Sequence, residues 1–371
     1  MTDASAWIPA GNADSVKGAR FLEFLLVGGG TLIFLPLCHL ARAYAGADDA
    51  ELALGFLAFH AAVIVNNPHF AVTYLLFYEN AKERAFGSVF KTPQRLRYVL
   101  SGFLAPLLLM GWAGNALYTH SAERLGWLLQ LMFLLVGWHY VKQGFGVLTV
   151  LSARRGVRFD RFERTAVLAH CFAGWLYART NPRDPGQDSL SDGVFYTSFA
   201  QPDGVALVTR VAFALSAAIL CWVLARKWRR DGGLPLVPLA GLLITVWLWV
   251  VYTRVDPLLV YVIPALHSLQ YLYFVWLLRK NRAAREAGPP AFKSATRALV
   301  VLAASAIALG WLLFRGAPNL LDGWLVLNDP VDPLGPTPYL AGLGAIVNIH
   351  HYLMDAVIWR RENPETALLL A

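Results

Sequence analysis

Five histidines of this chain lie at similar positions within long apolar stretches. They are His69, His139, His267 and the adjacent His350 and His351. A polar side chain near the middle of a bilayer is costly, so it usually has a partner or a function. Imidazole is also the commonest side-chain ligand of metal ions. Several imidazoles that converge on one layer of a membrane therefore indicate a buried metal site.

The distance from each histidine to the next basic residue gives its depth. The separation is ten to fifteen residues in these pairs: His69 and Lys82, His139 and Arg154, His267 and Arg279, His350 and Arg360. At 1.5 Å per residue, the difference of five residues between the shortest and the longest separation corresponds to about 7 Å along a helix. Four parallel helices can therefore place their imidazoles in one layer of the inner half of the membrane.

Polar residues accompany these histidines. Side chains three or four positions apart share a helix face, which gives the following neighbours: Lys142 and Gln143 after His139, Gln270 and Tyr271 after His267, and Asp355 after His351. Asp355 can accept the ring N–H of a metal-bound histidine or ligate directly. We expect Lys142 to pair with Asp355 or to bind an anionic group. Gln143, Asn67 and Tyr271 complete the predicted catalytic surroundings.

Two prolines predict broken helix turns close to these histidines. Pro68 directly precedes His69 in the run Asn66-Asn67-Pro68-His69, and Pro264 lies three residues before His267. Proline cannot donate to the preceding turn, and freed backbone groups at membrane depth are tolerated where they line a cavity or pack inside protein. A lone histidine in a membrane helix more often serves helix packing, which is our interpretation of His60 and His170.

The chain that carries these residues is strongly apolar. Of its 371 residues, 57% are hydrophobic and 15% are charged. About 20 residues are needed to cross the hydrocarbon core, and the sequence predicts one all-α membrane domain over residues 1–371. The ten predicted spans are 21–41, 51–78, 97–119, 124–152, 163–178, 204–225, 234–252, 257–278, 297–314 and 338–359.

The net charge of +8 is distributed by loop. Basic residues gather in alternate loops, for example Arg95 and Arg97, Arg154 and Arg155, Arg229 and Arg230. This is the positive-inside pattern, so we expect ten spans with both termini in the cytoplasm. The same distribution argues against a nucleic-acid partner and indicates the lipid bilayer as the main environment.

The predicted ligand set restricts the cofactor. Nitrogen ligands with one carboxylate and no thiolate suit iron, copper, zinc or manganese. Asp355 can supply negative charge beside the ion. The alternative is haem b held by two of the histidines, although histidines in a single layer disfavour two haems stacked across the membrane.

The order of these motifs resembles a known family. The chain has N-P-H at 67–69, W-H-Y at 138–140 with F-G at 145–146, His267, and H-H-Y-L-M-D at 350–355. This order is similar to that of the bacterial membrane-embedded carotene-cleaving dioxygenases of the Brp/Blh type. The resemblance implies an iron enzyme with histidine ligands that uses O2, in which His69, His139 and His267 match ligands. Tyr271 stands where that family has a further histidine, so His350 or His351 would complete the site.

We therefore predict a multi-pass oxygenase of the bacterial inner membrane, with Fe(II) and O2 acting on a polyene, terpenoid or other lipophilic substrate. Two alternatives from other classes stay open. One is an electron-transfer protein with bis-histidine haem or a quinone site. The other is a transporter with a midplane site at the broken helices. The sequence indicates no particular protein partner.

Overall fold

The computed structural model describes residues 13–182, 188–191, 194–197, 201–255, 258–287, 292–325 and 333–370. This part of the chain is helical, as the sequence predicts, apart from one antiparallel hairpin of β1 (Asp188–Ser191) and β2 (Val194–Thr197). Ser191 pairs with Val194 at the closed end of the hairpin and Asp188 with Thr197 at the open end.

The helices follow one another in this order: α1 (Ala13–Phe24), η2 (Leu25–Gly29), α2 (Thr31–Ala45), α3 (Ala47–Ala61), α4 (Asn66–Tyr78), α5 (Ala81–Ala85), α6 (Thr92–Val99), η3 (Leu100–Leu104), α7 (Ala105–Tyr118), α8 (Ala122–Arg154), α9 (Arg161–Thr180), α10 (Asp203–Asp231), α11 (Leu236–Leu243), η4 (Ile244–Val251), η5 (Tyr252–Arg254), α12 (Leu258–Ala287), α13 (Phe292–Trp311), η6 (Leu312–Gly316), α14 (Ala317–Trp324), α15 (Pro338–Ile358) and η7 (Pro364–Leu370).

Four helical segments within the described residues are long and apolar enough to cross a membrane. They are Thr92–Tyr118, Asp203–Asp231, Leu258–Arg285 and Thr296–Trp324. A fifth is possible by length and composition if Lys17–Gly29 and Thr31–Ala45, which meet at a bend of 57°, form one broken span. Large apolar side chains are exposed on all four of these segments, among them Leu107, Leu215, Val260 and Val300. Apolar faces of this kind indicate a membrane protein.

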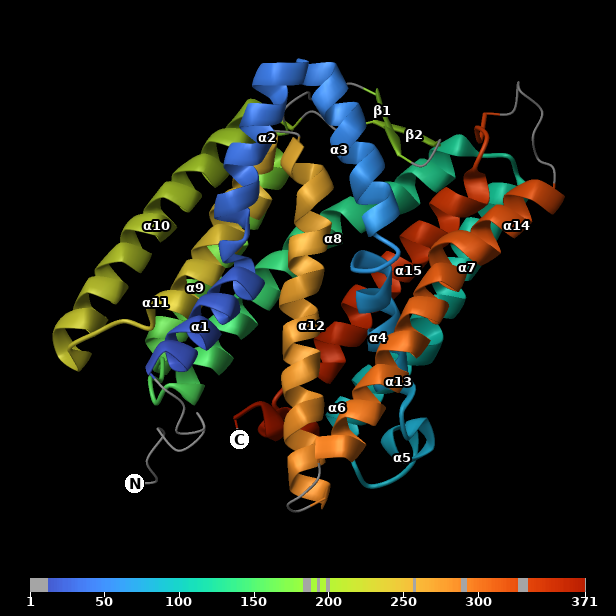
Figure 1. The fold of residues 1–371 in the computed structure, drawn as a ribbon. Helices are drawn as coiled ribbons and strands as arrows, with labels where there is room; N and C mark the ends of the chain where they lie inside the picture. Colours follow the sequence, from blue (N-terminus) through green and yellow to red (C-terminus); the bar gives the residue numbers. More distant parts are fainter. Residues whose placement is uncertain are drawn as a thin grey trace.

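The helix α12 runs through the middle of the molecule (Figure 1). In this view α1, α2 and α9 to α11 lie on one side of it, and α4, α7 and α13 to α15 lie on the other, while α8 crosses behind. The helix α4 packs against α13, α15 and α12, and α15 also packs against α8. The helices that carry His69, His139, His267 and His351 are therefore neighbours at the centre of the bundle.

The predicted break before His69 is confirmed. The helix α3 ends at Ala61 and α4 begins at Asn66, so Pro68 lies in the first turn, where a missing N–H breaks no helical hydrogen bond. Gly310 on α13 lets the two helices approach closely, since a Cβ there would lie 2.7 Å from the carbonyl oxygen of Asn67. The first turn of α4 is thereby fixed inside the protein.

The break that we predicted at Pro264 is absent. Pro264 lies inside α12, which continues from Leu258 to Ala287. Ser268 Oγ donates a hydrogen bond of 2.7 Å to the carbonyl oxygen of Pro264. A long helix that is packed on several sides can include one proline, because neighbouring groups compensate for the lost hydrogen bond.

Ion pairs fasten the basic end of the central helices. Arg279 and Arg282 on α12 contact Glu79, which follows α4, at 2.9 and 3.0 Å. Arg282 also pairs with Glu365 of η7 at 2.6 Å, and Arg84 pairs with the same carboxylate at 2.7 Å. These contacts join the end of α4 to α12 and to η7, and they restrain the two helices that carry His69 and His267.

Candidate metal centre

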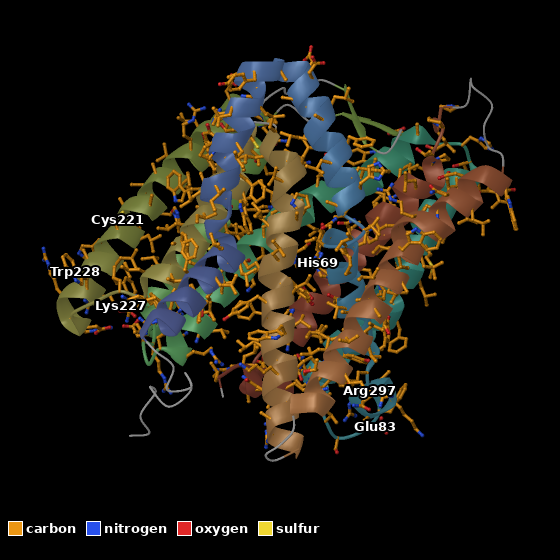
Figure 2. All side chains as sticks on the ribbon, viewed as in Figure 1. His69, Glu83, Cys221, Lys227, Trp228 and Arg297 are labelled. Carbon is orange, nitrogen blue, oxygen red and sulfur yellow. The ribbon has the colours of Figure 1, made fainter. Side chains whose placement is uncertain are left out.

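Four imidazoles converge at the middle of the bundle. His69 comes from α4, His139 from α8, His267 from α12 and His351 from α15. One ring nitrogen from each lies within 4.8 Å of the others, and all four side chains are buried. The Nε2 atoms approach in two pairs, His69 with His351 at 3.0 Å and His139 with His267 at 3.1 Å. Figure 2 shows His69 in the interior beside α12.

The orientation of the His69 ring is fixed by hydrogen-bond partners at Nδ1, the nitrogen that faces away from the centre. Its Nδ1 lies 3.0 Å from the carbonyl oxygen of Asn66 and 3.0 Å from Ser268 Oγ. Ser268 Oγ also lies within 3.0 Å of two oxygen acceptors, Asn66 Oδ1 and the carbonyl of Pro264. A protonated Nδ1 can donate to the Asn66 carbonyl, which leaves the lone pair of Nε2 directed at the centre, as metal ligation requires.

Asp355 lies on the side of the His139 and His351 rings that faces the centre. Its Oδ2 lies 3.4 Å from His351 Nε2 and 3.8 Å from His139 Nε2. Tyr271 donates to its Oδ1 at 2.9 Å, and the Tyr271 hydroxyl also bonds Thr73 Oγ1 at 2.6 Å. We predicted that Asp355 would orient a ligand from behind or ligate directly. Its contacts with Nε2 atoms favour the direct mode.

These residues fit a small divalent cation. Ligands about 2.1 Å from an ion lie roughly 3.0 to 4.2 Å apart in regular geometries. Both close Nε2 pairs lie within this range, and the limit of 4.8 Å for the whole group is slightly wider. Neutral imidazoles in this arrangement direct several lone pairs at one point. A cation with Asp355 beside it would balance this concentration of acceptors.

His350 is not among the four converging histidines, so the geometry favours His351 of the two predicted alternatives. The Nδ1 of His350 contacts the hydroxyl of Tyr74 at 3.0 Å. Successive residues of an α-helix point about 100° apart, and only one member of this adjacent pair faces the centre. His351 is the member of the pair that does.

Lys142 does not form the ion pair with Asp355 that was one of its two predicted roles. Its side chain is exposed, and its Nζ lies 5.7 Å from the ring centroids of both Trp138 and Phe145. Lys142 is three residues after His139 on the same helix, but its side chain is exposed whereas that of His139 is buried. The ammonium group therefore pairs with aromatic rings and not with Asp355.

Gln143 and Asn67 support the framework. Gln143 Nε2 donates to the carbonyl oxygen of His267 at 3.2 Å and to Gln270 Oε1 at 2.8 Å. Gln270 in turn donates to the carbonyl oxygen of Val27 at 2.6 Å. Asn67 is buried with an unpartnered Nδ2 and packs at Gly310. Both were predicted near the reacting groups, and among the described residues neither side chain forms a hydrogen bond with a histidine ring.

The sequence reasoning missed three supporting residues: Asn66, Thr73 and Ser268. Thr73 lies four positions after His69, so the spacing rule that selected Asp355 also selects it. The other two carry weaker signals. Ser268 simply follows His267, and Asn66 acts through its backbone carbonyl, which every residue has.

Comparisons of the chain with protein-family models, with curated proteins and with solved structures found no match.

Proposed function

We propose that this protein is a membrane-embedded non-haem iron oxygenase that acts on a lipophilic substrate with O2. The observation that carries the proposal is the convergence of four buried histidine nitrogens within 4.8 Å, drawn from four separate helices. Packing alone rarely requires such an arrangement, because each buried polar group needs only one partner. Imidazole ligands beside a carboxylate are a donor set that suits iron.

The side chains at this centre have different proposed roles. His69, His139, His267 and His351 would hold the ion, which when bound would supply the site for O2 to bind and be activated. Asp355 balances charge and can accept a proton at Oδ1, where Tyr271 now donates. Tyr271 and Thr73 hold that carboxylate in place. The buried position of the rings excludes bulk water from the reacting groups.

The apolar surroundings favour a substrate that arrives from the bilayer. The resemblance of the motif order to carotene-cleaving dioxygenases adds polyenes to the preferred substrates, beside terpenoids and lipids. We further propose the ten-span arrangement with both termini in the cytoplasm of a bacterium, on the strength of the alternating basic loops.

The geometry favours a single small ion over haem b. A porphyrin is a wide, flat ring that needs two ligands on opposite faces and open space around its edge. The other two imidazoles would occupy that space here, since all four nitrogens lie within 4.8 Å of one another. A transporter site at broken helices is supported at Pro68 only, because α12 continues through Pro264.

Anaerobic purification followed by metal analysis and an ultraviolet–visible spectrum tests the proposal. We expect about one iron per chain and no Soret band, because four histidines and one carboxylate complete a single site. A Soret band would select the electron-transfer alternative. Purified protein that contains no transition metal, and takes up none when Fe(II) is supplied, would refute the oxygenase.

A further inference from the structure

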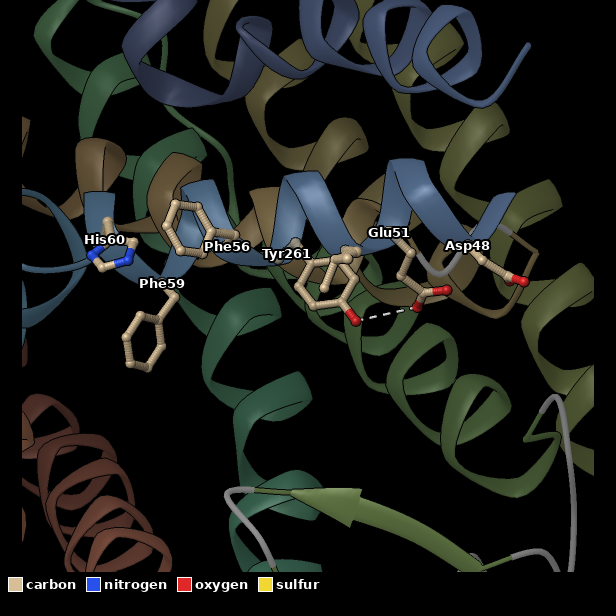
Figure 3. A pocket seen from close by; sticks show the side chains of 8 residues that line it. Asp48, Glu51, Phe56, Phe59, His60 and Tyr261 are labelled. Atoms are coloured by element: carbon tan, nitrogen blue, oxygen red, sulfur yellow. Dashed lines mark hydrogen bonds between the residues drawn. The ribbon is translucent and has the colours of Figure 1, made fainter. Parts of the chain in front are cut away.

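A groove runs along the outer surface between α3 and α12, apart from the metal centre (Figure 3). It is an open surface depression of about 580 Å³. Phe56, Phe59 and Tyr261 form its aromatic walls. Figure 3 shows Asp48 and Glu51 towards one end and His60 at the other, along the same helix.

The polar end of the groove is built from acceptors. Tyr261 donates to Glu51 Oε1 at 3.2 Å, and Asp48 lies one turn before Glu51 on the lining. A carboxylate has about four acceptor sites, so Glu51 can accept a second donor while it holds Tyr261. A ligand with a hydrogen-bond donor at one end therefore complements this end of the groove.

The rest of the groove suits a long apolar body. Glu51 and His60 are nine residues apart, which is about 13 Å along a helix. Phe56 and Phe59 line that length, and their rings pack edge-on against His60 at 4.4 and 5.3 Å between centroids. Gly55 keeps the two helices close, because a Cβ there would lie 3.3 Å from Tyr261 Cε1.

The two helices that line the groove also lead to ligands of the metal centre. The helix α3 leads through the break at residues 62–65 to His69 on α4. Tyr261 lies six residues before His267 on α12, which is about 9 Å along the helix axis. A molecule aligned with the groove, with its polar end at Glu51, therefore points its apolar end towards the level of the histidines.

We propose that this groove binds the hydroxyl-bearing end of the substrate, so that the enzyme selects lipophilic polyenes or isoprenoids with a terminal alcohol. The carboxylate of Glu51 or of Asp48 accepts the single hydroxyl hydrogen, and the aromatic side chains contact the adjoining chain. This inference rests on the proposed function for the reaction, but it assigns the recognition of the substrate to residues outside the metal centre.

Binding of all-trans-retinol and its methyl ether to protein in lipid nanodiscs tests the inference. The two probes share the polyene body, and only retinol donates a hydrogen bond. Energy transfer from tryptophan to the polyene reports binding without any turnover. We expect retinol to bind about tenfold more tightly than the ether, as a hydrogen bond to a charged acceptor predicts.

Matched variants locate the effect. Asp48→Asn with Glu51→Gln should weaken retinol binding about tenfold and leave the ether unchanged, while Asp49→Asn, outside the groove lining, should change neither. Gly55→Leu should block both probes, and Gly111→Leu, at a position where an added Cβ meets nothing within 4 Å, should block neither. Thermal unfolding of each variant shows whether it has folded.

The two proposals fail separately in this design, because metal content is measured on the same samples. The groove assignment would be wrong if the unaltered protein bound retinol and its ether with equal affinity. It would also be wrong if the Asp48 and Glu51 substitutions left the affinity for retinol unchanged. Discrimination between the probes by a protein without metal would keep the groove and overturn the oxygenase.

Discussion

Buried histidines occur in two regions of this protein with different surroundings. On α9, His170 stacks on Phe213 with ring centroids 5.0 Å apart, and its Nδ1 lies 2.9 Å from Ser216 Oγ. Ser216 donates its own hydrogen to the carbonyl oxygen of Phe213 at 2.8 Å, so the imidazole is the donor to Ser216. At the metal centre, by contrast, the ring nitrogens face one another.

The difference shows what a buried imidazole needs. One hydrogen bond and an aromatic neighbour are enough to accommodate His170 in an apolar layer. The centre brings four imidazoles to one point, and in each close Nε2 pair only one of the two nitrogens can carry the shared proton. A cation satisfies all of them together, so the number of converging rings separates a ligand from a packing residue.

The largest effect should come from changing a ligand of the centre. His351→Ala removes one of four converging nitrogens, and we expect bound metal to fall from about one ion per chain to less than about one tenth. His350→Ala is the matched control, since it changes the adjacent residue of the same helix and removes a contact with Tyr74. Metal analysis of both purified proteins makes the comparison.

Retention of metal by His351→Ala would mean that the four rings converge for packing, as His170 does for its own site. Equal loss of metal from His350→Ala would instead indicate that the end of α15 had unfolded. Circular dichroism of both variants separates these outcomes.

A smaller effect is expected at the carboxylate. Asp355→Asn keeps the shape and can still accept from Tyr271, but it removes the negative charge beside two Nε2 atoms. We expect metal affinity to fall about 10- to 100-fold, measured by competition with a chelator. Tyr271→Phe removes a hydrogen bond without changing charge, and a loss no greater than severalfold is expected there. Equal losses in the two variants would contradict a role for the charge itself.

Much of the centre could be predicted from the sequence because depth in a membrane follows from counting residues. A helix rises by a constant amount per residue, so His69, His139, His267 and His351 could be assigned to one layer before their contacts were known. Direction around the helix axis was less certain. Lys142 and Asp355 both satisfy the spacing rule, but only Asp355 points at the centre.

The membrane-spanning segments were harder to predict than the common depth of the histidines. Long apolar runs predict the segments that are most exposed, such as Asp203–Asp231. The helices with the other three ligands, α4, α8 and α15, are not among the four segments that pass as spans by length and composition. Their polar residues and the break before Asn66 lower the apolar signal, because helices that build a site must carry side chains that lipid does not favour.

The smallest effect should follow from changing the isolated histidine. His170→Phe keeps an aromatic ring against Phe213 and removes the hydrogen bond to Ser216. We expect a loss of about 1 kcal/mol of stability, seen as a drop of a few degrees in the thermal midpoint, with metal content unchanged. Ser216→Ala removes the same hydrogen bond from the other side and should give a similar shift. If either variant lost metal, His170 would act on the centre through α9, and the separation between the two kinds of buried histidine would be wrong.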